Sequence, residues 1–195
     1  MNGHRIILAS QSPRRKQLLE WAEIPFEILV QSTAETYPPN MPVPEVPVHI
    51  AREKAIAIRQ KYETLHDTNN IIIAADTVVV LGNTIIGKPK DREDALEILR
   101  QLSGNKHQVI TGVVLLKGQQ EIAFADITDV WFHPLTPAQI AFYVDKYQPY
   151  DKAGAYAIQE WIGVVGIKSI SGDFYNVMGL PVSRVVTELN KLVKT

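Results

Sequence analysis

The feature that most limits how this chain can fold is an almost wholly apolar run at residues 71–81, Ile-Ile-Ile-Ala-Ala-Asp-Thr-Val-Val-Val-Leu. Its length and its many β-branched residues are typical of a strand buried in a sheet. The pair that follows, Gly82-Asn83, predicts a tight hairpin into a short strand at residues 84–86. We therefore expect a fold that is organised around a sheet containing this run.

One carboxylate interrupts this run. Asp76 stands in its middle, and a carboxylate in a buried strand costs several kcal/mol unless it is paired or bound to a metal. Where such a strand reaches a cleft, the carboxylate is a candidate general base or metal ligand. The alternative is a structural ion pair or a cap at the end of the strand.

Helix and strand patterns alternate along the chain, which indicates an α/β domain with a mixed sheet. The expected strands are residues 5–9, 26–30, 71–81, 84–86, 109–116, 122–132 and 164–170. The expected helices are residues 13–21, 47–61, 91–102, 136–146 and 181–193. Asp91 and Thr136 are expected to cap the third and fourth of these helices. A long loop with five prolines, residues 31–47, stands between two of these elements. Loops of that length usually carry function or are disordered.

The first junction between strand and helix, Ser10-Gln11-Ser12-Pro13-Arg14-Arg15, concentrates polar chemistry. Ser12 is placed to cap the helix, and Pro13 suits its first position. Arg14 and Arg15 oppose the helix dipole there, so helix stability does not explain them. A bound anion would explain them, because backbone N–H groups, hydroxyls and guanidinium groups all stabilise negative charge. The alternative is a capped helix with a solvated basic face.

Two lysines are further candidate site residues. Lys54 lies in the apolar seam of the helix expected at residues 47–61, where snorkelling to solvent is favoured over a place in a polar cleft. Lys88 lies in Gly87-Lys88-Pro89, which allows close backbone approach and is a weak pattern for phosphate contact. The chain has no Walker-type run and no Gly-x-Gly-x-x-Gly, which excludes standard P-loop and dinucleotide-binding proteins.

Net charge and composition exclude further classes of protein and of functional site. The net charge is −1 over 195 residues, so no global basic field attracts nucleic acid, and any phosphate site must be local. The absence of cysteine excludes disulfides, thiolate zinc sites and a cysteine nucleophile. The N-terminus has no signal-peptide pattern, and no apolar run approaches the length of a membrane span. We expect a cytoplasmic protein that binds neither nucleic acid nor membranes.

The remaining candidate side chains favour structural roles. The five histidines show no metal-ligand spacing, so they are expected to be structural or surface residues. Trp161 would either stack on a base or pack in the fold, and packing is favoured.

Short motifs along nearly the whole chain resemble, in order, those of the Maf nucleotide pyrophosphatases. The first is Ser10-Gln11-Ser12-Pro13-Arg14-Arg15. The others are Ala51-Arg52-Glu53-Lys54-Ala55, Ala75-Asp76-Thr77-Val78-Val79, Gly87-Lys88-Pro89, Leu102-Ser103-Gly104, residues 151–159 and residues 177–181. One departure is Glu160-Trp161, where relatives often show a glycine-rich pair.

The resemblance implies one Maf-like domain over residues 1–195. Its fold would be α/β, a mixed β-sheet flanked by helices, with two lobes around a central cleft as in Maf and ITPase-like proteins. Such proteins hydrolyse nucleoside triphosphates to the monophosphate and pyrophosphate with a divalent cation, Mg²⁺ or Mn²⁺, and are often homodimers. Arg14, Thr77 and Gln159 occupy the positions that mark the subfamily acting on dTTP and UTP. The expected substrates are therefore these and modified pyrimidine nucleotides, in the house-cleaning of nucleotide pools.

The resemblance also assigns roles in the hydrolysis. Asp76 would be the general base or a metal ligand, and Glu35 would be the second carboxylate for the metal. Four cations would neutralise the triphosphate and the leaving pyrophosphate: Arg14, Arg15, Lys54 and Lys88.

The remaining roles concern substrate binding. Ser10 and Ser12, with nearby backbone N–H groups, would position the triphosphate. Gln159 offers a donor and an acceptor to the edge of uracil or thymine, and Thr77 would support that pocket.

A different class of function also fits the resemblance. Maf proteins have been linked to septum formation, so a nucleotide-binding regulator of cell division with little turnover is the alternative. The presence of Asp76, Glu35 and the cations favours the enzyme, because a regulator could lose its carboxylates.

Overall fold

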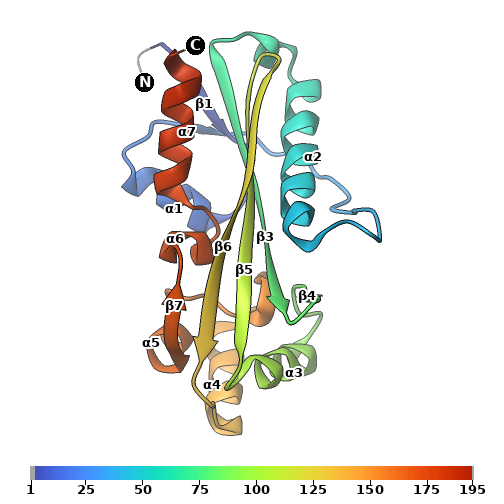
Figure 1. Ribbon diagram of the computed structural model, residues 1–195, viewed down its shortest axis with the longest axis vertical. Helices are drawn as coiled ribbons and strands as arrows, with labels where there is room; N and C mark the ends of the chain where they lie inside the picture. Colours follow the sequence, from blue (N-terminus) through green and yellow to red (C-terminus); the bar gives the residue numbers. More distant parts are fainter. Residues whose placement is uncertain (1–2, 195) are drawn as a thin grey trace. The chain divides into compact units, whose positions relative to one another are not determined.

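The computed structural model describes residues 3–194, which divide into two compact units (Figure 1). Unit 1 comprises the described residues of Met1–Asp76, Thr111–Asp126 and Gly179–Thr195. Unit 2 comprises Thr77–Ile110 and Ile127–Met178. The expectation of two lobes is thereby confirmed, whereas a single functional domain and a central cleft stay predictions.

The strands form a mixed sheet, as the sequence predicts. Its order is β2-β1-β3-β5-β6-β7, with β4 paired to β3. Strand β1 is parallel to β2 and β3, whereas β4 is antiparallel to β3 and β7 is antiparallel to β6. The strands are β1 (Arg5–Leu8), β2 (Glu27–Ile28), β3 (Asn70–Leu81), β4 (Thr84–Ile86), β5 (Lys106–Lys117), β6 (Gln120–Phe132) and β7 (Ile167–Ser171).

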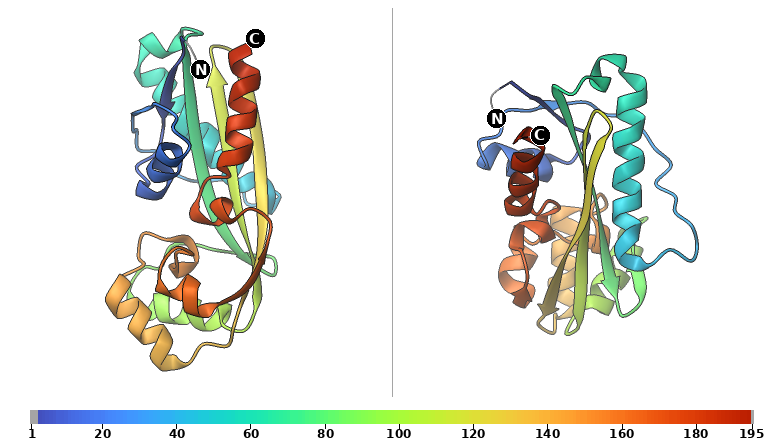
Figure 2. Two further views of the ribbon diagram at one scale, coloured as in Figure 1. Left: turned by 90° about the vertical axis from the view of Figure 1, so that its left-hand side faces the viewer. Right: turned by 45° about the horizontal axis from the view of Figure 1, so that its top comes forward.

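In unit 1, helix α2 lies on one side of the strands, and α1 and α7 lie on the other (Figures 1 and 2). Helix α2 packs Ala51, Ala55 and Ile58 into a core that also contains Ile7 of β1 and Ile72 of β3. The i, i+4 and i, i+3 spacings of these buried residues give the helix its apolar face. The helical elements of unit 1 are α1 (Pro13–Trp21), η1 (Val43–Glu45), α2 (Val46–Lys61), η2 (Glu63–His66) and α7 (Val182–Lys194).

Helix α2 and strand β5 approach each other closely. A Cβ atom at Gly112 would stand 2.2 Å from the backbone nitrogen of Val48 and 2.3 Å from the carbonyl carbon of Pro47. Only glycine therefore fits at this position of β5, and its absent side chain lets the first turn of α2 rest on the strand.

The expected helix caps are present in unit 2. Asp91 accepts the Asp94 N–H at 2.9 Å and so caps α3. Thr136 and Gln139 form a reciprocal capping box at the start of α4. The helical elements of unit 2 are α3 (Arg92–Leu102), α4 (Pro137–Tyr147), η3 (Ala153–Ala155), α5 (Trp161–Gly166) and α6 (Phe174–Met178).

The strand expected at residues 164–170 is partly wrong. Residues 161–166 form helix α5, and only Ile167–Ser171 form a strand. The Glu160 carbonyl starts the helix by accepting the N–H groups of Gly163 and Val164. The valines that suggested a strand are not core residues, and Val164 is 82% exposed. The backbone hydrogen bonds of this turn therefore outweigh the β-propensity of the valines.

The other expected elements are confirmed with small changes of their bounds. The strand expected at residues 26–30 is limited to Glu27–Ile28, and α2 begins one residue before the expected position. Helix α6 was not expected from the sequence, although Asp173 caps it by accepting the N–H groups of Tyr175 and Asn176. Within residues 3–194, no helix is both long and apolar enough to cross a membrane.

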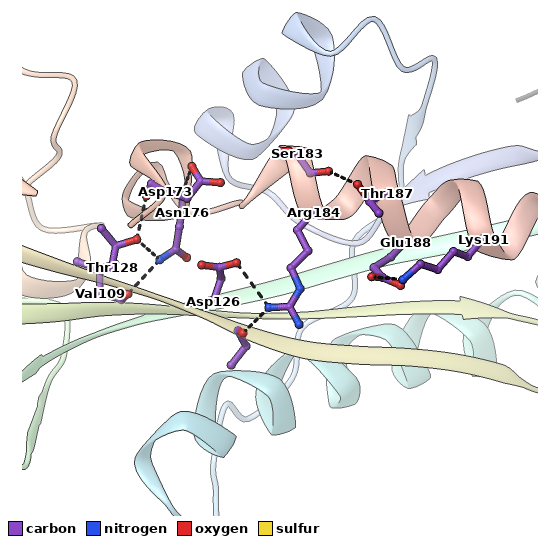
Figure 3. Close-up of polar contacts among 11 residues, drawn as sticks. Val109, Asp126, Thr128, Asp173, Asn176, Ser183, Arg184, Thr187, Glu188 and Lys191 are labelled. Carbon is purple, nitrogen blue, oxygen red and sulfur yellow. Dashed lines mark hydrogen bonds and ion pairs between the residues drawn. The ribbon is translucent and has the colours of Figure 1, made fainter. Parts of the chain in front are cut away.

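Polar contacts fasten the segments that follow β7 (Figure 3). In unit 2, the buried Asn176 donates to the Val109 carbonyl at 3.1 Å and to Thr128 Oγ1 at 2.9 Å. In unit 1, the Arg184 guanidinium donates to the Ala125 carbonyl at 2.9 Å and lies over the Phe124 ring. These contacts fix α6 and α7, each against the strands of its own unit.

Candidate active site

A lysine held between two carboxylates is the main polar cluster of unit 1. The Lys54 Nζ atom lies 2.7 Å from Asp76 Oδ1 and 2.7 Å from Glu35 Oε1. The Lys54 and Asp76 side chains are only 16% and 15% exposed, and Glu35 is 44% exposed. The interpretation that Lys54 snorkels to solvent is therefore wrong, because its side chain is largely buried and its ammonium group is paired with two carboxylates.

Close packing of α2 explains how Lys54 reaches these partners. Ala51 and Ala55, the small residues flanking Lys54 on this helix, are fully buried. Together with the glycine at position 112, they bring α2 near to the sheet. The long side chain of Lys54 then extends to Asp76 on β3, where the carboxylate interrupts the apolar strand.

Glu35 is held in an uncommon backbone conformation. Its φ angle is +50°, in the left-handed region that a residue with a side chain seldom adopts. Such a conformation costs on the order of 1 kcal/mol or more and persists only where the surroundings hold it. The long proline-containing loop therefore presents this carboxylate to Lys54 at a conformational cost.

The turn between β1 and α1 is closed by its own hydroxyl groups. Ser12 Oγ accepts the Arg15 N–H at 3.4 Å, which confirms Ser12 as the N-cap. Ser10 Oγ accepts the Ser12 N–H at 3.2 Å and the Arg15 Nη1 group at 3.1 Å. The two serines thus order the junction that the sequence marked as a candidate anion site.

Arg15 ties this junction to a distant part of the chain. Its Nε group donates to the Gly179 carbonyl at 2.8 Å, and Gly179 has a φ angle of +116° that favours glycine. Burial lowers the pKa of Arg15, whereas the charges of Asp76 and Glu35 raise it. The guanidinium therefore belongs to the same electrostatic neighbourhood as the two carboxylates, and the positive charge of Arg14 also acts on it. The sequence did not single out Gly179 as a partner of Arg15, although it lies in a motif of the resemblance.

Three expected site residues belong to unit 2. Lys88 is exposed in the loop after β4, and Thr77 is half-buried at the point where β3 enters this unit. The Gly87 carbonyl accepts the Gly154 N–H at 3.0 Å, which fastens the Lys88 loop to η3.

Gln159, the third of them, is exposed and lines a pocket of about 390 Å³. Most of the other lining residues are apolar. They are Ile158, Gly163, Val164, Ile167, Ser169, Ile170 and Phe174. The amide of Gln159 is therefore one of the few polar groups in a largely apolar pocket, an arrangement that is common in small-molecule sites.

Trp161 and His107 both have structural roles. The Trp161 ring packs edge-on against Phe142 with centroids 4.9 Å apart, so the packing interpretation is confirmed. His107 is buried, and its Nε2 atom is hydrogen-bonded to Tyr156 Oη at 2.7 Å, which is a structural role.

The donor set of unit 1 suits a magnesium-like ion. Across residues 3–194 there is no cluster of three or more histidine, aspartate or glutamate side chains that could hold a metal. Mg²⁺ commonly needs only one or two protein carboxylates, because water and substrate phosphates complete its coordination. Asp76 and Glu35 face one common cation, the Lys54 ammonium, so they present two hard oxygen donors to one place.

The chain is similar to known proteins over nearly its whole length. A model of the family described as "Maf-like protein" matches residues 5–192. The chain is 50% identical over 187 residues to the "dTTP/UTP pyrophosphatase" of Cytophaga hutchinsonii, which covers 96% of this chain and 84% of the relative. It is 46% identical over 193 residues to the protein of the same name from Bacteroides thetaiotaomicron, with 98% of each chain covered. The solved structure of the Staphylococcus aureus Ham1 protein is more distant, with a TM-score of 0.44, 15% identity, and coverage of 66% of this chain and 71% of that chain.

Proposed function

The chain belongs to the Maf-like protein family, and from this premise we propose that it hydrolyses dTTP and UTP to the nucleoside monophosphate and pyrophosphate. Such an activity removes excess or modified pyrimidine nucleotides from the nucleotide pool. The observation that carries the proposal is the cluster of Lys54, Asp76 and Glu35, joined at 2.7 Å. The names of the relatives support the same substrates.

In this proposal, the turn between β1 and α1 holds the triphosphate. Its serine hydroxyls and the N-terminal N–H groups of α1 bind phosphate oxygens. Arg15 is already fixed by Ser10 and Gly179, so it supplies positive charge without losing side-chain entropy on binding. Arg14 and Lys88 add charge that offsets the leaving pyrophosphate.

Asp76 carries the hydrolytic step. Its carboxylate takes a proton from the attacking water while the water oxygen bonds to the α-phosphorus and the bond to the bridging oxygen breaks. Pyrophosphate then leaves with the electron pair of that bond. The ion pair with Lys54 orients the carboxylate, because one oxygen is engaged at 2.7 Å. In the alternative role for Asp76, it would hold a Mg²⁺ or Mn²⁺ ion together with Glu35, and this ion would neutralise phosphate charge and activate the water.

In this proposal, Gln159 recognises the pyrimidine base of the substrate through hydrogen bonds. The amide has both a donor and an acceptor, which match the N3–H and carbonyl groups of uracil or thymine. The apolar lining of its pocket suits the faces of a pyrimidine ring, and Thr77 supports the recognition.

The test is a pyrophosphate-release assay over dTTP, UTP, CTP, dATP and GTP, with Mg²⁺, Mn²⁺ or EDTA. We expect turnover of dTTP and UTP to exceed that of the purine nucleotides by about a hundredfold and to stop in EDTA. Binding of UTP without release of pyrophosphate in any metal would instead support the alternative, a nucleotide-binding regulator of cell division.

Three further expectations belong to the proposal. A cytoplasmic location is supported by the absence of cysteine, and the lack of nucleic-acid binding is supported by the net charge of −1. A homodimer rests on the family resemblance, and light scattering of the purified protein measures it directly.

A further inference from the structure

Gln159 stands on a four-residue turn of unit 2, residues 157–160, that is closed twice. The Glu160 N–H donates to the Ala157 carbonyl at 3.1 Å, which closes the backbone. Tyr143 closes the turn a second time through its side chain. Its hydroxyl group donates to Glu160 Oε2 and accepts the Ala157 N–H at 3.1 Å. We call this relay from Glu160 through Tyr143 to Ala157 the clamp.

The clamp is anchored in the core of unit 2. Tyr143 lies on α4, its side chain is fully buried, and its ring stacks on Tyr147 with centroids 5.0 Å apart. The Lys152 Nζ atom lies 3.7 Å from Glu160 Oε1, and these side chains are only 10% and 22% exposed. The Glu160 carboxylate is therefore held by a hydroxyl group on one oxygen and faces an ammonium group on the other.

Ile158, the residue before Gln159, is also held in place. The Ile158 side chain is buried, and its carbonyl oxygen would stand 1.7 Å from a Cβ atom at Gly163. The start of α5 thus rests directly on the Ile158 backbone. With the Ile158 side chain buried and both ends of the turn closed, the exposed Gln159 is held where it lines its pocket.

We propose that Glu160 and Tyr143 are positioning residues that set base selectivity by fixing Gln159. This inference rests on the proposed role of Gln159 in base recognition. A glutamine on a mobile turn could bring its amide to the base from several positions and so accept the edge of cytosine as well as that of uracil. The clamp fixes the backbone on both sides of Gln159, which limits the positions that the amide can reach, and we expect this restriction to favour uracil.

The test is the ratio of kcat/KM for UTP to kcat/KM for CTP. Tyr143→Phe keeps the ring and removes the hydroxyl group, and Glu160→Ala removes the carboxylate. We expect each variant to lower the ratio by about tenfold, mainly through a higher KM for UTP, since the clamp acts on the base and not on the reacting atoms. Glu160→Gln should retain most of the ratio, because its amide oxygen still accepts from Tyr143. Tyr150→Phe is the matched control, since it removes the hydroxyl group of an exposed tyrosine in the same unit.

A double-variant comparison isolates the mechanism. In a Gln159→Ala background, Tyr143→Phe and Glu160→Ala should cause no further loss of the ratio, because the side chain they position is gone. Further loss in that background, or an unchanged ratio in Glu160→Ala alone, overturns the inference. If Gln159→Ala itself leaves the ratio unchanged, it is the proposed base recognition that fails. Should Tyr143→Phe not fold, the comparison of Glu160→Ala with Glu160→Gln decides the question alone.

Discussion

The ammonium nitrogen of Lys54 lies 2.7 Å from a carboxylate oxygen of Asp76, although the two residues are 22 positions apart. Neither side chain is well exposed, so each provides the charge that makes burial of the other tolerable. The pair joins helix α2 to the strand that carries the interrupting carboxylate. It also places that carboxylate in a fixed orientation, which the proposed role of Asp76 as a general base would require.

The first prediction concerns Asp76 itself. Asp76→Asn keeps the shape of the side chain but removes its capacity to accept a proton, so pyrophosphate release should fall by about a hundredfold or more. Calorimetric titration with UTP should show that binding largely survives. Glu121→Gln is the matched control, because it neutralises a carboxylate of unit 1 that pairs with another residue of α2, Arg52. Unchanged turnover in a folded Asp76→Asn protein would refute the assignment.

The second prediction concerns Glu35 and the metal. Glu35→Gln removes one of two carboxylates that face a common position, so the Mg²⁺ concentration for half-maximal rate should rise by about tenfold. The measurement is a Mg²⁺ titration of UTP hydrolysis. Glu45→Gln, an exposed carboxylate at the far end of the same loop, serves as the control. A metal requirement that does not change would remove Glu35 from the proposed metal site.

The third prediction concerns the fastening of Arg15. Lysine cannot donate to the Gly179 carbonyl and to Ser10 Oγ in the geometry that the guanidinium uses. Arg15→Lys should therefore lower the free energy of unfolding by about 1–3 kcal/mol in urea titrations. Arg100→Lys, at an exposed pair with Glu97, should change it by less than about 0.5 kcal/mol. Equal effects of the two changes would contradict the structural role of Arg15.

The fourth prediction concerns the contact between α2 and β5. Gly112→Ala places a Cβ atom 2.2 Å from the backbone of Val48, so the helix must shift. We expect a loss of about 3 kcal/mol or more in the free energy of unfolding. Gly87→Ala introduces the same atom into open space and serves as the control. Gly112→Ala should also reduce turnover, because α2 carries Lys54, and wild-type stability of this variant would be the contrary result.

The fifth prediction concerns pH. Burial lowers the pKa of His107 from its ordinary 6.5 to about 4, against the opposing charge of Asp129. Between these values the unfolded chain binds a proton that the folded protein excludes. Stability is therefore full above about pH 6.5 and is lost as the pH falls toward 4, by about 3 kcal/mol at most.

Urea unfolding at several values of pH tests this account of His107. His107→Gln should show a shallower pH dependence than the wild type, whereas replacement of the exposed His66 should not alter it. The same slope in wild type and His107→Gln would mean that other groups cause the loss of stability.

Local signals were sufficient for much of the fold. Ser12, Asp91 and Thr136 cap helices where the sequence predicts, because a cap involves only a residue and the next turn. The turn at Gly82-Asn83 likewise joins β3 to β4 as expected. The strand expected at residues 164–170 was partly wrong, because the β-branched residues there suggest a strand, whereas the Glu160 carbonyl accepts the N–H groups that start helix α5.

The sequence by itself determined that the carboxylate at Asp76 needs a partner, since a charge in an apolar strand is costly wherever the strand lies. Only the tertiary structure decided that the partner is Lys54, that Glu35 joins them, and that Arg15 reaches Gly179 across 164 positions. It also showed that Glu160, where the sequence departs from the family motif, belongs to the clamp and is hydrogen-bonded to Tyr143. The physical reason is that burial costs and caps follow from neighbouring residues, whereas ion pairs and relays depend on which surfaces pack together.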